Sequence, residues 1–163
     1  MSLLHSNVEH QLRELGAEYT EMECDPAFAD TALFCERYGV DPADSANTIL
    51  IASKRPADVY GVCLALATTR LDVNHAVRDA LEVKKLSFAP ADVTLQITGM
   101  EIGGVTPFGL PEALPILVDS AVMLRSSIVL GGGNRTSKLR LAPDELLRLP
   151  QLRVIEGLAA PVA

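Results

Sequence analysis

Two apolar runs near the middle of the chain constrain its fold most strongly. The segments NTILIAS (residues 47–53) and VYGVCLALA (residues 59–67) are rich in aliphatic and β-branched residues, which favour strands. The turn-prone segment KRPAD separates them. Two such runs joined by a short turn predict neighbouring strands in the centre of a sheet.

Helices and further strands are expected on both sides of this pair. Capping and stop signals predict helices that begin at Ser6, Asp30, Asp72 and Pro90 and end near Gly16, Gly39, Leu81 and Gly99. Extended segments are predicted at 17–23, 83–89, 114–120, 126–133, 137–143 and 152–155, with a short helix beginning at Pro143. The elements do not alternate regularly, as a doubly wound fold requires. We therefore expect an α+β fold with a mixed, largely antiparallel central sheet, or a partly closed barrel, with packed helices.

Length and composition fit a single domain over residues 1–163. The chain has no internal repeat, low-complexity tract or linker that would mark a boundary. Hydrophobic residues make up 48% of it, but aromatic residues only 4%, and Trp is absent. The core must therefore be aliphatic, and an extended stacking platform for single-stranded nucleic acid is disfavoured.

The net charge of −7 argues against broad non-specific adhesion to nucleic acid or to anionic membranes, because such binding needs basic clusters. A local basic site is still open, since no acidic residue lies between Asp119 and Asp144. Four basic residues fall in that window: Arg125, Arg135, Lys138 and Arg140. They form either a solvated face or a phosphate-facing patch, and charge alone favours the solvated face.

The cysteines and the N-terminal segment favour a cytoplasmic protein. The three cysteines, Cys24, Cys35 and Cys63, form no CxxC pair, which suits a reducing compartment. The first residues lack a basic region followed by an apolar run, and no stretch approaches the length of a membrane span. We therefore expect no membrane partner.

The common catalytic signatures are absent from the sequence. His5, His10 and His75 have no further ligand at metal-binding spacing. The chain contains neither GxSxG nor HExxH, and GGGNRTSK lacks the Gly-Lys-Ser/Thr ending of a P-loop. Cys63 lies in an apolar strand segment and is expected to be a core residue. An enzyme of this sequence would work without an obvious triad, metal or cofactor.

Two glycine-rich segments are the strongest candidates for a site. GGVTPFG (Gly103 to Gly109) and GGGNRTSK (Gly131 to Lys138) each adjoin a predicted strand. Glycine permits positive φ and close approach of a ligand to the main chain. Both segments could therefore present backbone N–H groups to a ligand, or both could simply be turns.

The order of these segments resembles a known family. DPADSANTILIAS is followed by LDVNHAVRDALEVKKLSFAPADV, TGMEIGGVTPFG, PILVDSAV and IVLGGGNRTSKLRLAPDEL. Over roughly residues 15 to 150 this succession resembles the YbaK/prolyl-tRNA synthetase-associated domain family. The family includes freestanding deacylases and an editing insertion of some bacterial prolyl-tRNA synthetases. The resemblance implies a YbaK-like fold and a single editing domain.

The resemblance also implies a site built from the two loops. Amides around Gly103 and Gly104 would face an aminoacyl ester, and Thr106 would be a pocket hydroxyl or a turn residue. Pro107 and Gly109 would hold the shape of the loop. The second loop would form the opposite wall and bring two basic residues near the terminal phosphates: Gly131, Gly132, Gly133, Arg135 and Lys138.

One position departs from the family pattern in a way that affects the chemistry. Many members place a lysine just before the first central strand, where this chain has Asn47. Asn can donate and accept hydrogen bonds but carries no charge. Lys54 lies at the other end of that strand, about 20 Å away, and does not replace it. Lys138 stands where some cysteine-specific relatives have an aspartate, and Met22 where an aromatic residue occurs.

The implied function is hydrolysis, in trans, of the ester between a wrong amino acid and the 3′ end of a transfer RNA. Prolyl-tRNA carrying alanine or cysteine is the family-level expectation for the substrate. Because an aminoacyl ester is already activated, the protein would mainly orient it and stabilise the oxyanion. The expected partners are the aminoacyl-tRNA acceptor end and an aminoacyl-tRNA synthetase. The alternative is a non-catalytic module that binds aminoacyl-tRNA or an aminoacyl-nucleotide and has lost turnover.

Overall fold

Three open sheets organise the chain, of which the computed structural model describes residues 2–162. The α-helices are α1 (Ser6–Glu14), α2 (Thr31–Tyr38), α3 (Arg78–Leu81) and α4 (Ala91–Thr98). Short 3₁₀ segments are η1 (Pro26–Phe28), η2 (Pro42–Asp44), η4 (Ser120–Leu124) and η5 (Pro143–Arg148), and η3 (Val73–Val77) is a π-helical turn. The strands are β1 (Thr20–Glu23), β2 (Ala46–Arg55), β3 (Ala57–Leu66), β4 (Thr69–Leu71), β5 (Lys85–Phe88), β6 (Ile116–Asp119), β7 (Ile128–Gly131), β8 (Ser137–Leu141), β9 (Leu152–Ile155) and β10 (Ala159–Pro161).

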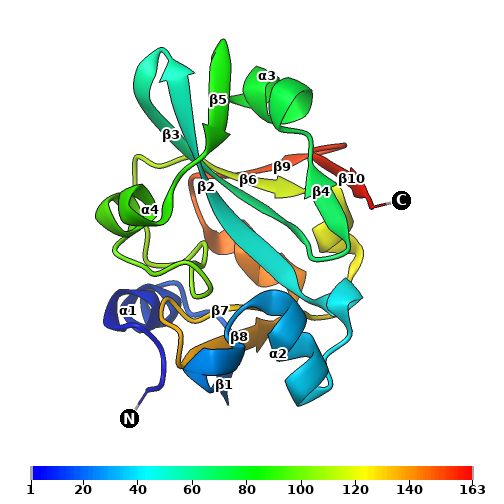
Figure 1. Cartoon of the computed structure of the whole chain (residues 1–163). Coiled ribbons are helices and arrows are strands. Elements are labelled where there is room, and N and C mark those ends of the chain that lie inside the picture. The colour runs from blue at the N-terminus through cyan, green and yellow to red at the C-terminus, as the bar shows by residue number, and fades with distance from the viewer. Residues whose placement is uncertain (1, 163) are drawn as a thin grey trace.

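The main sheet has five strands in the order β5-β2-β3-β6-β9. Strand β2 is antiparallel to both β3 and β5, whereas β6 is parallel to β3 and β9. A three-stranded antiparallel sheet, β1-β8-β7, lies below it in Figure 1, and β10 pairs with β4. The fold is thus α+β with mixed sheets, as expected, and its described strands form open sheets rather than a closed barrel.

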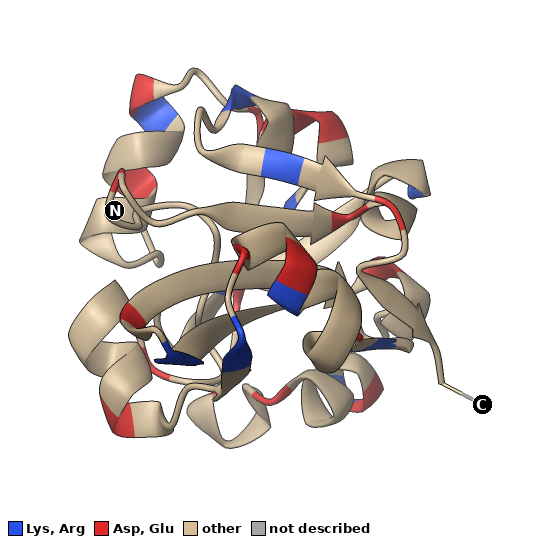
Figure 2. Ribbon diagram, turned by 90° about the horizontal axis from the view of Figure 1, so that it is seen from above, with Lys and Arg blue, Asp and Glu red and all other residues tan. Residues whose placement is uncertain are grey.

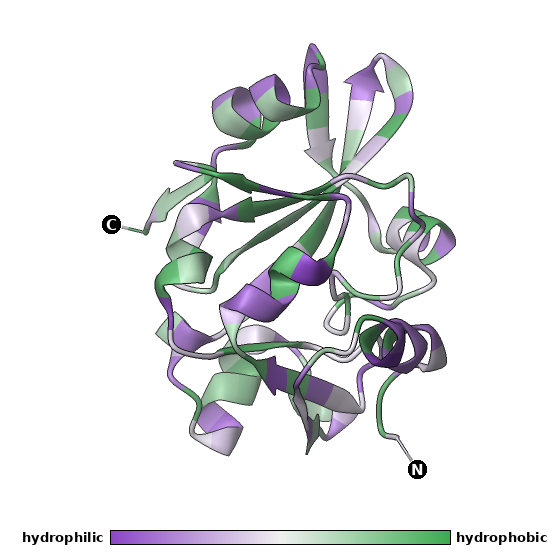
Figure 3. Ribbon diagram, turned by 180° about the vertical axis from the view of Figure 1, so that it is seen from behind, coloured by the Kyte–Doolittle hydropathy of each residue, from purple (hydrophilic) through white to green (hydrophobic). Residues whose placement is uncertain are grey.

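The β2–β3 hairpin is central because both faces of β3 are covered. Residues 61–66 of β3 are buried without interruption. Leu64 packs in the larger core, between the main sheet, the small sheet and α1, and Cys63 packs in a second core under η3 and α3. Aliphatic side chains dominate both cores, and the central strands are accordingly green in Figure 3. Burial of this kind is the main favourable term in folding.

Strand β2 is paired on both sides over only half of its length. Strand β3 follows it from Ala46 to Lys54, but β5 joins it only from Ile51 onward. The segment 46–49 therefore has a strand partner on one side alone. Strand β7 of the small sheet approaches this segment, with a bridge from Ser45 to Val129. The half-paired segment lies at the junction of the two sheets.

Local details differ from the expectations at several element ends. His5, not Ser6, caps α1, because its Nδ1 accepts from the Asn7 amide at 3.1 Å. Asp30 and Asp72 precede helical segments but make no side-chain cap bond, and the segment after Asp72 begins as a π turn. Strands β4 and β10 are short and were not predicted. Acidic and basic residues are interspersed over the molecule (Figure 2).

Candidate functional site

The two glycine-rich loops pack directly against each other. Gly133 donates its amide to the carbonyl of Gly104 at 2.7 Å. A Cβ on Gly104 would overlap the main chain of Asn134, and one on Gly131 would come within 2.6 Å of the Gly104 and Val105 oxygens. The two loops can approach this closely only because Gly104 and Gly131 have no side chain.

Most of the amides in these loops are engaged within the fold. Gly104 donates to the Glu101 carbonyl at 2.9 Å, and Gly132 donates to the Ser137 carbonyl at 3.2 Å. Along this wall the amides of Gly103 and Val105 have no hydrogen-bond partner within residues 2–162. Any backbone contact to a ligand is therefore available from these two amides rather than from Gly104.

The remainder of the first loop is anchored to the body of the protein. The Gly109 amide donates to Oε1 of Gln11 on α1 at 2.6 Å. Thr106 and Pro107 are buried, and Gly109 has a φ of 78°. The Thr106 hydroxyl has no hydrogen-bond partner in the described chain. Thr106 does not line the cavity described next, so the loop holds it as part of the interior.

A cavity of about 200 Å³ lies between the half-paired part of β2, strand β7 and the first loop. Its polar lining comes mainly from five side chains: Asp30, Thr31, Asn47, Thr48 and Lys138. Gly103, Val105 and Gly131 contribute backbone to the same wall. The cavity therefore brings together residues from both predicted loops and from the start of β2.

Lys138 provides a buried cation in this wall. Its side chain is only 6% exposed, and its Nζ donates to the carbonyls of Ala29 at 2.7 Å and Gly103 at 2.9 Å. The Nζ also lies 5.3 Å from the centre of the Phe34 ring. Burial lowers the pKa of the Lys138 ammonium below its usual value. Because an ammonium has three N–H donors, these two bonds leave one donor without a carbonyl acceptor.

The start of β2 supplies two polar side chains with different surroundings. Asn47 accepts through Oδ1 a short hydrogen bond from the Thr31 hydroxyl of α2. Thr48 lines the cavity, and its buried hydroxyl has no partner within residues 2–162. A buried unpaired hydroxyl is costly unless a ligand or water satisfies it. Thr48 was not among the residues predicted for the site, although it directly follows Asn47 on the first central strand.

Arg135 holds the rim of the cavity together. Its guanidinium donates to the carbonyls of Ile102 at 2.7 Å and Pro26 at 3.0 Å, and pairs with Asp30 at 3.2 Å. Two other basic residues of the acid-free window are also engaged, Arg125 with Asp44 at 2.8 Å and Arg140 with the Ser127 hydroxyl. The basic side chains between Asp119 and Asp144 therefore bond to other groups of the protein and do not form a patch of unpaired charges.

Other candidate groups lie outside the cavity. Burial raises the pKa of Cys63 to about 12, and this fully buried thiol is a core residue, as expected. Lys54 is exposed. Within residues 2–162 no three His, Cys, Asp or Glu side chains are grouped to hold a metal ion. None of the helices in that range is both long and apolar enough to span a membrane.

Comparison with known proteins identifies the family. The sequence profile of the aminoacyl-tRNA editing domain matches residues 25–149. The chain belongs to the aminoacyl-tRNA editing domain family. A curated relative, "Uncharacterized protein YwhH" of Bacillus subtilis (strain 168), is 29% identical over 129 residues, which cover 79% of this chain and 78% of that protein. The YbaK-type resemblance of the sequence is thereby confirmed.

Solved structures agree with this assignment at the level of the fold. The editing domain superimposes on hypothetical protein APE2540 with a TM-score of 0.81 and 21% identity, covering 95% of this chain and 100% of that one. It superimposes on a candidate trans-editing enzyme for prolyl-tRNA synthetase with a TM-score of 0.78 and 20% identity, covering 92% and 93% of the two chains. The fold of the editing domain is therefore that of these structures.

Proposed function

We propose that this editing domain hydrolyses the ester between a wrong amino acid and the 3′ end of a transfer RNA, acting in trans and without a metal. The observation that carries the proposal is the buried Lys138 ammonium in the wall of the small polar cavity. A buried cation whose hydrogen-bond acceptors are carbonyls rather than a carboxylate is suited to an oxygen that gains negative charge.

The reaction needs little more than orientation and charge stabilisation. Water adds to the carbonyl carbon, the carbonyl oxygen becomes an oxyanion, and the C–O bond to the ribose then breaks. The proton lost by water ends on the departing ribose oxygen, so that the products are a free amino acid and a transfer RNA with its hydroxyl restored. The neighbouring ribose hydroxyl can position the attacking water.

In this proposal the oxyanion lies against the free N–H of Lys138 and the amides of Gly103 and Val105. Gly103, Val105 and Lys138 line the cavity, and the two amides have no partner within residues 2–162. Thr48 and Asn47 would orient the substrate from the opposite side. The carboxylate of Asp30, at the same wall, would attract the α-ammonium of the amino acid.

Lys138 also supplies the positive charge that Asn47 lacks. Many family members have a lysine just before the first central strand. In this chain the cation that lines the cavity is Lys138, which lies on β8 instead. Lys138 and Asn47 line the same cavity, so the loss of a cation at one position is matched by a cation at the other. This pairing favours turnover over the alternative of a binding module without activity.

The size of the cavity favours a small amino acid. In the proposed complex a volume of about 200 Å³ holds the α-ammonium and the ester carbonyl as well as the side chain, and a cavity of about 150 Å³ is filled by benzene alone, so alanine or cysteine fits better than a large aromatic amino acid. Together with the likeness to a candidate trans-editing enzyme for prolyl-tRNA synthetase, this supports alanine or cysteine on the proline transfer RNA. An aminoacyl-tRNA synthetase is the partner that such an activity would accompany.

A deacylation panel tests the proposal. Purified protein is incubated with transfer RNAs charged with alanine, cysteine, serine, proline and phenylalanine, and release of the amino acid is followed against buffer. We expect fast release of a small amino acid and slow release of phenylalanine. Binding of a non-hydrolysable 3′-amide analogue without hydrolysis of any ester would instead establish the binding module.

A further inference from the structure

A second and larger hollow adjoins the cavity and has the composition of a nucleotide site. It has a volume of about 730 Å³ and lies on the face of the main sheet opposite the larger core. Its walls come from β2, β4, the start of η3 and the end of β5. Asn47 and Ile49 line both this hollow and the small cavity. The half-paired segment of β2 is therefore a common wall of the two spaces.

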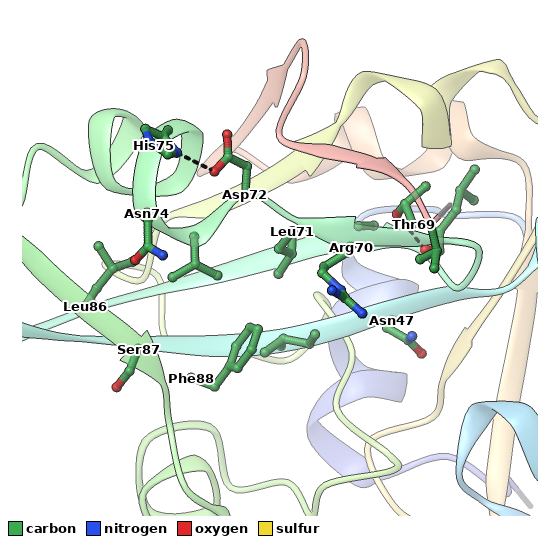
Figure 4. Close-up of a pocket in the computed structure, with 15 residues that line it drawn as sticks. Asn47, Thr69, Arg70, Leu71, Asp72, Asn74, His75, Leu86, Ser87 and Phe88 are labelled. Carbon is green, nitrogen blue, oxygen red and sulfur yellow. Dashed lines mark hydrogen bonds and ion pairs between the residues drawn. The ribbon is translucent and has the colours of Figure 1, made fainter.

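Phe88 is the feature of this hollow that points to a base. It is the last residue of β5, and it is 53% exposed although it lines the hollow. Figure 4 shows its ring standing in the hollow beside β2. An exposed aromatic face next to a polar cavity is a stacking surface for a nucleobase. A single ring suits one base rather than a run of bases, in keeping with the low aromatic content of the chain.

Arg70 is the feature that points to a phosphate. It projects from β4 into the same hollow and lies between Phe88 and Asn47 in the view of Figure 4. Within residues 2–162 its guanidinium takes part in no ion pair. The acidic residue of this lining, Asp72, is bonded to His75 Nδ1 at 3.0 Å. A guanidinium without an anionic partner is well suited to a phosphate.

We infer that this hollow, here called the nucleoside groove, holds the terminal nucleoside 5′-phosphate of the acceptor end. The inference rests on the proposed function for the position of the ester. A 3′-aminoacyl nucleotide has three substituents on the ribose: the ester, the base and the 5′-phosphate. With the ribose over Asn47 and Ile49, the ester enters the small cavity, the base stacks on Phe88 and the phosphate pairs with Arg70.

Binding of non-hydrolysable probes tests the groove without requiring turnover. The first probe is adenosine 5′-phosphate with alanine in amide linkage at the 3′ position. The second lacks the base, and the third lacks the 5′-phosphate. We expect wild-type protein to bind the first probe roughly tenfold to a hundredfold more tightly than the base-free probe, as expected for one stacked base.

Matched variants assign these differences to residues. Phe88→Ala should abolish the preference for the base, and Phe88→Tyr should retain it. Arg70→Gln should abolish the preference for the 5′-phosphate and leave the preference for the base. Leu95→Ala, a change at another exposed apolar residue outside the groove, should alter neither.

The outcomes separate this inference from the proposed function. Equal binding of the base-containing and base-free probes by wild-type protein, or an unchanged preference in Phe88→Ala, would overturn the groove. Absence of deacylation with a base preference that depends on Phe88 would overturn only the proposed turnover. Deacylation that is insensitive to both Phe88→Ala and Arg70→Gln would agree with the cavity as the ester site and would overturn the groove as the nucleoside site.

Discussion

Replacement of Lys138 by methionine is the sharpest test of the site. The side chains have similar length, so Lys138→Met removes the charge and the three N–H donors while keeping most of the volume. If the ammonium stabilises the oxyanion, its loss should lower kcat for the preferred mischarged transfer RNA by about 10²–10³-fold, the usual effect of deleting one oxyanion donor. KM should change much less, because the contact is strongest in the transition state.

The effect of the same substitution on stability is expected to be small. The carbonyls of Ala29 and Gly103 lose their Lys138 donor, which costs about 1–3 kcal/mol for each group left unsatisfied. Against this, removing a buried cation without a carboxylate partner eliminates a desolvation penalty of several kcal/mol. The two contributions oppose each other, so the free energy of unfolding should change by less than about 2 kcal/mol.

Single-turnover deacylation and denaturant unfolding measure the two quantities separately. Lys54→Met is the matched control, because Lys54 is exposed at the far end of β2 and should affect neither. Lys138→Arg, which keeps the charge but changes its shape, should retain part of the rate. Wild-type kcat in Lys138→Met, with the fold intact, would refute the role of the ammonium.

Further predictions follow from the contacts around the cavity. Gly104→Ala should destabilise the protein by about 1–3 kcal/mol, measured by urea unfolding, because the new methyl group would overlap the Asn134 main chain; unchanged stability would contradict the loop–loop packing. Thr48→Val should raise the free energy of unfolding by about 1 kcal/mol and weaken binding of the 3′-amide analogue, since the Thr48 hydroxyl lacks a partner within residues 2–162; unaltered affinity would argue against a ligand contact. Because burial lowers the pKa of Lys138, the unfolded chain binds more protons between that lowered pKa and the ordinary lysine value, so the Lys138 contribution to stability rises with pH across that window. The stability difference between wild type and Lys138→Met should therefore shift in favour of wild type as pH rises through the window, and a pH-independent difference would contradict the shift. Asn47→Lys in the Lys138→Met background should restore part of the lost deacylation rate. No recovery would show that a cation at position 47 cannot replace the cation at position 138.

The central hairpin was predictable because its signal is local. The apolar runs at 47–53 and 59–67 and the turn between them became β2 and β3, paired from Ala46 to Lys54. The same runs could not reveal that β5 leaves the segment 46–49 without a second strand partner. That depends on the register between β2 and a strand about thirty residues away, which no short-range pattern encodes. This half-paired segment nevertheless contributes to the lining of both the cavity and the groove.

The glycine-rich loops show what composition alone could not predict. Their composition predicted a site in this region, but glycine permits close approach of any neighbour. At Gly104 that neighbour is the main chain of Asn134, and the Gly104 amide is bonded to Glu101. Composition alone cannot distinguish a backbone kept bare for a ligand from one kept bare for another loop. The amides available to a ligand, on Gly103 and Val105, emerge only from the hydrogen bonds.

Lys138 and Asn47 illustrate why residues of one cavity are hard to connect from the sequence. In sequence the two positions are far apart, so a missing lysine at 47 and an extra lysine at 138 are independent observations. In the fold they line one cavity, and the Lys138 ammonium is held by two carbonyls. A cation at a buried site is maintained at a cost in solvation, and two main-chain carbonyls lessen that cost without neutralising the charge. In the proposed reaction this charge, left without a carboxylate partner, stabilises the carbonyl oxygen of the bound ester.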